Sequence, residues 1–197
     1  NVWAEGTAKY VFYFIGDGMG VNQVNGTETF LAALDGRIGT RPLQFAQFPN
    51  VALATTFSAT NGVTDSAAGG TALATGKKTK NGVLGMLADQ KTSISSIAEQ
   101  AKKSGKSVGI ATSVSVDHAT PASFYAHVPN RSLYYQIGKD LIRAGFDFYA
   151  GSDFLEPNDP KKKDTKDLYT ACEEAGAGKT KPDIYCLLYT SDAADEL

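Results

Sequence analysis

Short apolar runs rich in β-branched and aromatic residues constrain the fold of this chain more than any other feature. The first, YVFYFIG at residues 10–16, is almost continuously apolar, which is typical of a strand buried on both faces. Three further runs are VALATTF at 51–57, SVGIATSV at 107–114 and FDFYAG at 146–151. We predict that all four are strands of one mostly parallel sheet.

Apolar residues at helical spacing lie between the later runs. Thr92 is expected to cap a helix with Gly105 as its C-cap, and the apolar stripe of this helix is Ile94, Ile97, Ala98 and Ala101. Ser132 is expected to cap a second helix that stops at Gly145, with the stripe Leu133, Ile137, Leu141 and Ile142. Strands that alternate with helices predict an α/β fold, with a mostly parallel sheet and helices on both of its faces.

The composition narrows the class of protein. The 197 residues are 42% hydrophobic and 20% charged with a net charge of -2, which argues against nucleic acid as the main partner. No segment is long and apolar enough for a membrane span. The charged segment 156–167 is expected to be a surface loop.

The domain organisation is expected to be simple. Residues 1–185 are expected to form the N-terminal part of a single domain. The stretch CLLYTSDAADE, which begins at Cys186, back-translates to a sequence that resembles a common sequencing adapter. We therefore expect 186–197 to be a non-native tail and the natural protein to continue differently after residue 185.

Small side chains crowd around Ser66 in VTDSAAGGTALATG at residues 63–76. Thr64 or Asp65 is a fair N-cap, which places Ser66 in the first turn of a helix, where unpaired N–H groups and the helix dipole favour an anion. One interpretation is that Ser66 only helps to cap this helix. The other is that its hydroxyl attacks a phosphorus atom, activated by a metal because no histidine adjoins it.

Polar residues at the ends of the predicted strands suggest a metal site. Asp17 follows the first strand in the turn GDGMG and either holds a cation or satisfies the backbone of its own turn. His118 and Thr120 follow the third strand and are able to share one metal, or else form a polar turn. His127 lies too far along the chain for that site and is expected to be structural.

Arg131 is the only arginine near these elements. A guanidinium holds two phosphoryl oxygens in a bidentate manner, which a lysine cannot do. The alternative is a solvated arginine beside a helix start, where its positive charge is unfavourable against the helix dipole.

Three segments of this chain, taken in order, resemble the motifs of the alkaline phosphatase family. They are FIGDGMG, VTDSAAGGTALATG, and VDHATPASFYAH followed by Arg131. The resemblance implies that Ser66 is the nucleophile that forms a phosphoserine, that Arg131 clamps the phosphate and that Asp65 orients Arg131. The expected tasks of the small residues are to keep the phosphate pocket open (Ala67, Ala68) and to let the helix lie close to the sheet (Gly69, Gly70, Ala72).

The resemblance also implies two zinc ions and one magnesium ion as cofactors. Asp17 corresponds to a carboxylate that bridges a zinc and the magnesium, Thr120 to a magnesium ligand, and Ser66 to the hydroxyl that one zinc activates. Many bacterial members carry Asp where this chain has His118, and animal members carry His, so His118 is expected to tune the magnesium site. The remaining ligands of the family lie in a C-terminal half, and the two histidines of this chain are too few to replace them.

The implied reaction is the hydrolysis of small phosphomonoesters by the complete protein, with the truncated chain inactive. We expect a periplasmic or secreted protein that forms a homodimer, with no nucleic-acid partner. Two alternatives stay open: a phosphodiesterase or sulfatase-like hydrolase of the same superfamily, and a non-catalytic phosphate-binding protein. Serine as the nucleophile favours the monoesterase, since such relatives commonly use threonine or a modified cysteine.

Overall fold

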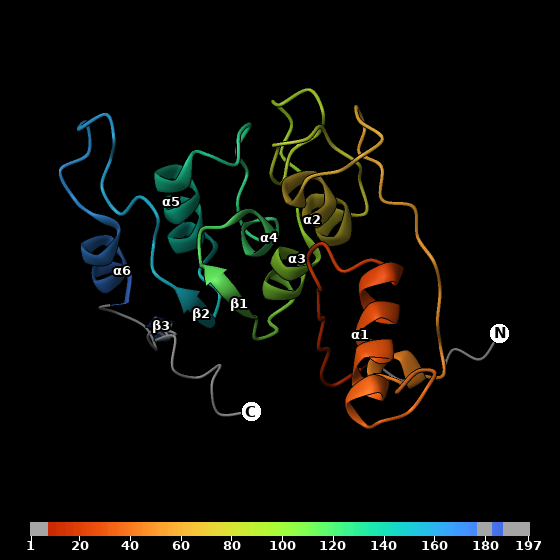
Figure 1. The fold of residues 1–197 in the computed structure, drawn as a ribbon. Coiled ribbons are helices and arrows are strands. Elements are labelled where there is room, and N and C mark those ends of the chain that lie inside the picture. The colour runs from red at the N-terminus through yellow and green to blue at the C-terminus, as the bar shows by residue number, and fades with distance from the viewer. Residues whose placement is uncertain (1–7, 177–182, 187–197) are drawn as a thin grey trace. The chain divides into compact units, whose positions relative to one another are not determined.

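The computed structural model describes residues 8–176 and 183–186 (Figure 1). The chain divides into two compact units, residues 1–54 and 55–197. Each unit is described by itself. In the described residues, no helix has both the length and the apolarity needed to cross a membrane.

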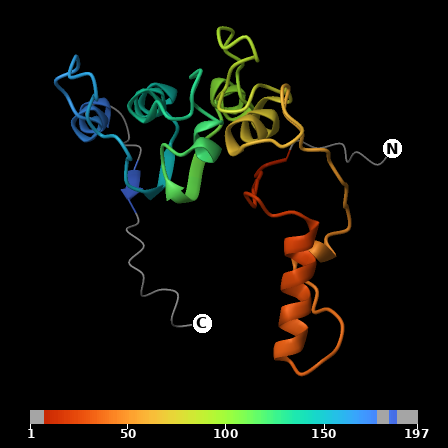
Figure 2. The same ribbon diagram turned by 45° about the horizontal axis from the view of Figure 1, so that its top comes forward.

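The first unit is built around one helix, α1 (Val21–Leu34), and a short 3-10 helix, η1 (Phe45–Gln47). Figure 2 shows the segment after α1 running back beside it, where Arg41 N donates to Glu28 O at 2.9 Å. Helix α1 begins after Gly20, whose N–H donates to the Gln23 side chain at 3.0 Å. The sequence pattern did not predict α1, because Gly26 and two threonines lie in its interior.

Residues 10–16 are not a strand in the structure, and neither are residues 51–57. Tyr10, Phe12 and Phe14 are 71%, 79% and 89% exposed, and of residues 8–54 only Ala32 is buried. The strand prediction for both runs is therefore wrong for this chain. The physical reason is that a strand exists only when a neighbour pairs with its N–H and C=O groups, and neither run pairs with a strand among the described residues of its own unit.

The second unit contains a parallel sheet in the order β1 (Gly109–Ser115), β2 (Phe148–Ser152), β3 (Asp183–Cys186). The predicted strands 107–114 and 146–151 are thus confirmed with shifted ends. The register pairs Ala111 with Ala150 and then shifts, so that Ser115 pairs with Ser152. A Cβ on Gly151 would lie 2.8 Å from the Val114 carbonyl oxygen, so this close approach requires a glycine.

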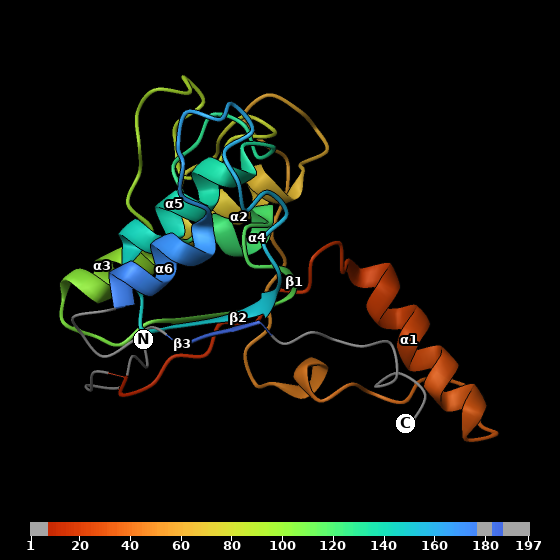
Figure 3. The same cartoon turned by 90° about the vertical axis from the view of Figure 1, so that its left-hand side faces the viewer.

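Helices connect these strands, as the α/β prediction requires. Between β1 and β2 lie α4 (Ala119–Ala122) and α5 (Tyr134–Ala144), and between β2 and β3 lies α6 (Leu168–Gly176). Helices α2 (Ser66–Thr75) and α3 (Ile97–Lys103) precede the sheet. Figure 3 shows the helices of this unit on one face of the sheet. Helices on the second face remain a prediction for the complete protein.

The predicted helix ends are partly corrected. Ser96, not Thr92, caps α3: its hydroxyl accepts from Glu99 N at 3.0 Å, and the Glu99 carboxylate accepts from Ser96 N at 2.7 Å. Thr92 instead donates to the Asp89 carboxylate at 2.7 Å. Gly145 ends α5 with φ +59°, as predicted, although α5 begins after Leu133 and not after Ser132.

Aromatic side chains form the core between α5 and the sheet. Tyr149 stacks on Phe146 with ring centroids 5.9 Å apart and meets the edge of Tyr125 at 5.8 Å. The Tyr149 hydroxyl donates to Leu141 O at 3.0 Å, so its polar end is satisfied inside the core. Other fully buried large side chains of the unit are Leu84, Ile137, Leu168 and Val83. This core supports the loop after β1, which carries His118 and Thr120.

The predicted surface loop at 156–167 is confirmed as an irregular segment without helix or strand. The predicted tail at 186–197 begins at the last residue of β3, and residues 187–197 lie outside the described part of the chain.

Candidate active site

Ser66 is the first residue of α2, the position that the sequence predicts for it. Asp65 is the N-cap, and its Oδ1 accepts from Ala68 N at 2.9 Å. The Ser66 hydroxyl makes no hydrogen bond to any other residue that the structure describes, and the side chain is half-buried. Asp65 therefore does the capping, and the Ser66 hydroxyl remains available at the positive end of the helix.

Asp65 also binds Arg131, which lies 66 residues further along the chain. The Arg131 guanidinium is 3.2 Å from Asp65 Oδ2, and both side chains are about a quarter exposed, at 26% and 25%. The same Oδ2 accepts from Gly82 N at 3.0 Å, and Arg131 N donates to Gly82 O at 2.7 Å. One carboxylate therefore joins the start of α2, the turn at Gly82 and the arginine.

The sequence interpretation missed Gly82. It adopts φ +84°, which favours glycine, and it follows Asn81 in an Asn-Gly turn pair. The Asn81 side chain donates to Val63 O at 3.0 Å, which ties this turn to the segment before α2. The Asn-Gly pair could have predicted a turn at this position, but not that the turn contacts Asp65 and Arg131.

His118 and Thr120 lie where β1 leads into α4. His118 is the N-cap of α4 but makes no side-chain cap, and its Nδ1 is buried without a hydrogen-bond partner among the described residues. Thr120 lies beside α2, because its carbonyl oxygen is 3.7 Å from where a Cβ on Gly70 would be. The structure thus brings the start of α4 against the helix that begins with Ser66.

The packing of α2 corrects the expected tasks of its small residues. A Cβ on Gly70 would lie 2.4 Å from Ser123 Oγ, so Gly70 allows α2 to approach α4 and not the sheet. Ala67 and Ala68 are 0% and 2% exposed, so they belong to the core and do not line an open pocket. Small residues at this position are needed for helix–helix contact.

Asp117 is a buried carboxylate next to His118. It is 0% exposed, and its Oδ2 accepts from Leu155 N at 2.9 Å, which ties the end of β1 to the loop after β2. Its Oδ1 has no partner among the described residues. Burial raises the pKa of Asp117 above its ordinary value.

His127 is part of a structural network, as predicted. Its Nδ1 is 2.7 Å from Gly85 O, its Nε2 is 2.9 Å from Glu99 Oε1, and its backbone N donates to Asp140 Oδ2 at 2.9 Å. The hydrogen bond to Glu99 raises the pKa of His127. This histidine joins α3, α5 and the Gly85 turn.

Asp17 lies in the first unit, in a turn closed by Met19 N donating to Gly16 O at 3.2 Å. Its convergence with Ser66 and His118 stays a prediction. Within residues 8–176 and 183–186, no three His, Cys, Asp or Glu side chains cluster in a way that holds a metal ion.

The model of the family described as alkaline phosphatase matches residues 8–146, which is more than half of the chain. Alkaline phosphatase from Gadus morhua is 36% identical over 150 residues, which cover 70% of this chain and 31% of the cod protein. The tissue-nonspecific isozyme from Gallus gallus is 38% identical over 140 residues, which cover 66% and 27% of the respective chains.

Solved structures agree with these matches. Alkaline phosphatase from the Antarctic bacterium TAB5 is 36% identical with a TM-score of 0.68, over 81% of this chain and 44% of that one. The Thermus thermophilus enzyme is 35% identical with a TM-score of 0.64, over 78% and 32%. The chain spans less than half the length of these relatives. The chain belongs to the alkaline phosphatase family.

Proposed function

We propose that the complete protein hydrolyses phosphomonoesters and that Ser66 is its nucleophile. One observation carries this proposal: the Ser66 hydroxyl, at the start of α2, has no hydrogen-bond partner among the described residues, while the preceding Asp65 holds Arg131 at 3.2 Å. Backbone N–H groups of the first turn and a guanidinium both favour a dianionic phosphoryl group. The family to which the chain belongs supports the same reaction.

In the proposed reaction, Ser66 Oγ forms a bond to phosphorus as the bond to the leaving alkoxide breaks, which yields a phosphoserine. Water then attacks the same phosphorus and releases inorganic phosphate with Ser66 restored. Arg131 binds two of the equatorial oxygens, and Asp65 keeps its guanidinium in place. The first-turn N–H groups orient the phosphoryl group for in-line attack.

The donor set at the start of α4 fits a metal ion. The Nδ1 of His118 is buried without a hydrogen-bond partner in the described part of the chain, which makes it an available ligand. The hydroxyl of Thr120 adds an oxygen donor of the kind that Mg²⁺ prefers. We propose that His118 and Thr120 hold magnesium together with Asp17, and that Asp17 and Ser66 contribute to two zinc sites. When bound, such ions lower the pKa of a coordinated hydroxyl and stabilise the attacking and leaving oxygens.

A solved variant of the TAB5 enzyme, in which a histidine is replaced by glutamate, has Mg bound in a site named M3. A second variant of that enzyme carries aspartate and also has Mg bound there. These two variants support the proposal that a magnesium site is also present in the complete protein. We place His118 at that site.

The cell compartment and the assembly are proposed on the family resemblance. We propose a periplasmic or secreted enzyme that acts as a homodimer on small phosphomonoesters. Secretion of the complete gene product into the periplasm of a bacterial host, and light scattering of the purified protein, test these two points.

The test of function uses the completed protein with p-nitrophenyl phosphate as substrate. Ser66→Ala is expected to abolish most turnover while the circular dichroism spectrum stays unchanged. Arg131→Ala is expected to raise the phosphate inhibition constant at least about tenfold, because a bidentate charged contact is lost. Arg41→Ala, an exposed arginine paired with Asp35 in the first unit, is the matched control and should leave both values unchanged.

Full turnover in Ser66→Ala would contradict the assignment of the nucleophile. Faster turnover of bis-p-nitrophenyl phosphate than of the monoester would favour the phosphodiesterase alternative. Phosphate binding without any turnover in the completed protein would favour the non-catalytic alternative.

A further inference from the structure

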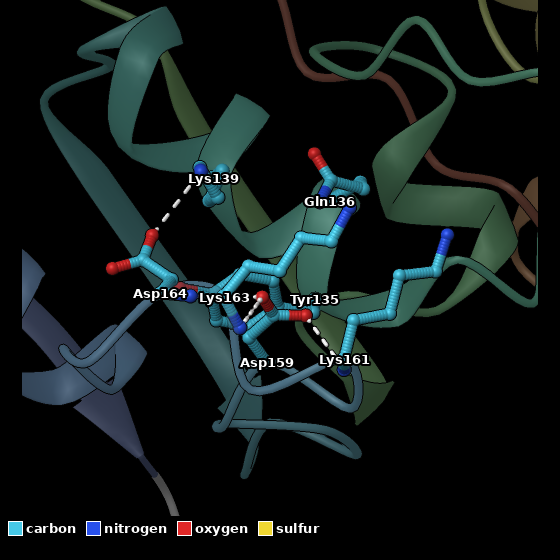
Figure 4. Close-up of a pocket in the computed structure, with 7 residues that line it drawn as sticks. All are labelled: Tyr135, Gln136, Lys139, Asp159, Lys161, Lys163 and Asp164. Atoms are coloured by element: carbon cyan, nitrogen blue, oxygen red, sulfur yellow. Dashed lines mark hydrogen bonds and ion pairs between the residues drawn. The ribbon is translucent and has the colours of Figure 1, made fainter.

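A polar hollow separate from the candidate active site lies between α5 and the loop at 157–167. Its volume is about 390 Å³, within the range of small-molecule sites. Tyr135, Gln136 and Lys139 of α5 line one side, and Asp159, Lys161, Lys163 and Asp164 of the loop line the other (Figure 4). Three lysines and two aspartates give these lining residues a net charge of +1.

The loop is wrapped around the carboxylate of Asp159. Asp159 Oδ1 accepts from Lys161 N at 3.0 Å, and its Oδ2 accepts from Lys163 N and from Asp164 N, both at 3.0 Å. These backbone donors lower the pKa of Asp159, so it stays ionised. Both Asp159 oxygens therefore accept from the loop backbone, and the carboxylate forms no ion pair with a lysine ammonium of the described residues.

Asp164 is occupied in a similar way. Its Oδ2 is 3.3 Å from the Lys139 ammonium, and its Oδ1 accepts from Lys166 N at 3.3 Å. Lys139 also lies over the ring of Tyr135, 5.5 Å from the ring centroid. Lys139 is thus paired with an acid. Asp159 and Asp164 are held by these contacts, without any from the ammonium groups of the other two lysines.

The ammonium groups of Lys161 and Lys163 are not engaged in ion pairs with any residue in the described part of the chain. In Figure 4 both side chains extend from the loop on the side of Gln136, whereas Lys139 points toward Asp164. Two ammonium groups and a side-chain amide therefore line the hollow, and none of the three donates a hydrogen bond to another described residue.

We propose that this hollow binds a small soluble ligand with two linked phosphoryl groups, of the pyrophosphate type. Two ammonium groups that form no ion pair with the described residues match a ligand with at least two anionic groups, and the Gln136 amide supplies a further donor. Lysines act as point charges and not as bidentate forks, so the charge and span of the ligand matter more than the orientation of each phosphoryl group. The proposal does not depend on the function assigned to Ser66.

The test is isothermal titration calorimetry of the 197-residue chain with inorganic pyrophosphate, in a Ser66→Ala background that removes the proposed nucleophile. Pyrophosphate is expected to bind at least about tenfold more tightly than inorganic phosphate, and more weakly as salt is raised. The double variant Lys161→Gln/Lys163→Gln is expected to weaken pyrophosphate binding at least about tenfold.

Two control variants separate this site from others. Lys91→Gln removes an exposed lysine from a different loop and is expected to leave pyrophosphate affinity unchanged. Arg131→Ala removes the proposed phosphate clamp, so pyrophosphate binding that remains in this variant lies outside the candidate active site. Backbone amide NMR shifts on titration are expected at residues 159–164.

Three results would overturn the proposal. The first is equal affinity for phosphate and pyrophosphate, and the second is unchanged affinity in the double lysine variant. The third is loss of all pyrophosphate binding in Arg131→Ala, which would assign the binding to the candidate active site. Failure of the Ser66 proposal shows instead as turnover in Ser66→Ala, so the two proposals fail separately.

Discussion

The Asp65 carboxylate lies 3.2 Å from the Arg131 guanidinium with one oxygen and caps α2 with the other. The residue next to the proposed nucleophile therefore holds both the helix that presents Ser66 and the arginine proposed to bind phosphate. Gly82 N donates to the oxygen that faces Arg131, at 3.0 Å. Variants of Asp65 are expected to separate these tasks.

Asp65→Asn is expected to keep the cap and lose the arginine contact. If the amide oxygen accepts from Ala68 N, the amide NH₂ faces two other donors, Gly82 N and Arg131. Phosphate inhibition of the completed protein should therefore weaken, and loss of the hydrogen bond from Gly82 N should cost about 0.5–1.5 kcal/mol of stability. Asp65→Ala loses every contact and should also destabilise the protein by about 1 kcal/mol through the missing cap. Urea denaturation and phosphate inhibition measure the two effects, and equal stability of both variants would contradict the capping role.

Gly70→Ala is expected to destabilise the protein by about 1–3 kcal/mol, because its Cβ would lie 2.4 Å from the Oγ of Ser123, the C-cap of α4. Gly69→Ala is the matched control in the same helix, since its Cβ would lie 3.5 Å from the nearest atom, on Thr64. That change should stabilise the helix by up to about 1 kcal/mol. Urea denaturation of both variants measures the difference, and the same sign for both would show that α2 and α4 are not in close contact.

The pH dependence of stability is expected to reflect His127 and Glu99. The Glu99 hydrogen bond raises the pKa of His127 above 6.5, so its contribution is complete below that pH and is lost as pH rises through the folded pKa. Burial opposes ionisation of Glu99, but His127 and the Ser96 N–H outweigh it and hold the pKa of Glu99 below 4.5. The Glu99 contribution is therefore present above pH 4.5 and is lost as pH falls through its folded pKa.

NMR titration of the imidazole signals tests this expectation, because the chain has only two histidines. Glu99→Gln should lower the pKa of His127, and His127→Gln should flatten the loss of stability above neutral pH. His118→Gln serves to assign the remaining signal. A His127 pKa unchanged by Glu99→Gln would contradict the pairing.

His118→Asp is expected to shift metal preference toward magnesium in the completed protein, because a carboxylate oxygen suits Mg²⁺ better than an imidazole nitrogen does. Metal content after dialysis against mixed zinc and magnesium measures the change. His118→Gln, which removes the imidazole and adds no charge, is the control. A magnesium content that is the same in all three proteins would remove His118 from the metal site.

Local patterns predicted the elements that depend on local physics. Strands β1 and β2 were predictable from their apolar runs. The end of α5 at Gly145 was predictable because a glycine with φ +59° ends a helix regardless of its surroundings. The neighbouring residues likewise predicted that Asp65 caps α2 and that Ser66 lies in its first turn. The cap of α3 did not, because Ser96 is additionally held by its hydroxyl donating to Phe124 O, 28 residues away.

The sequence by itself determined the residue types of the candidate site and the alternation of strands and helices, since both depend on residues that are close together in the chain. Only the tertiary structure decided which partners they meet. Residues 10–16 have the composition of a buried strand, yet they are exposed, because pairing depends on a neighbour that composition does not specify. Asp65 and Arg131 meet across 66 residues because α2 packs on α4 through Gly70 and the Gly82 turn binds both, a convergence that no local pattern encodes.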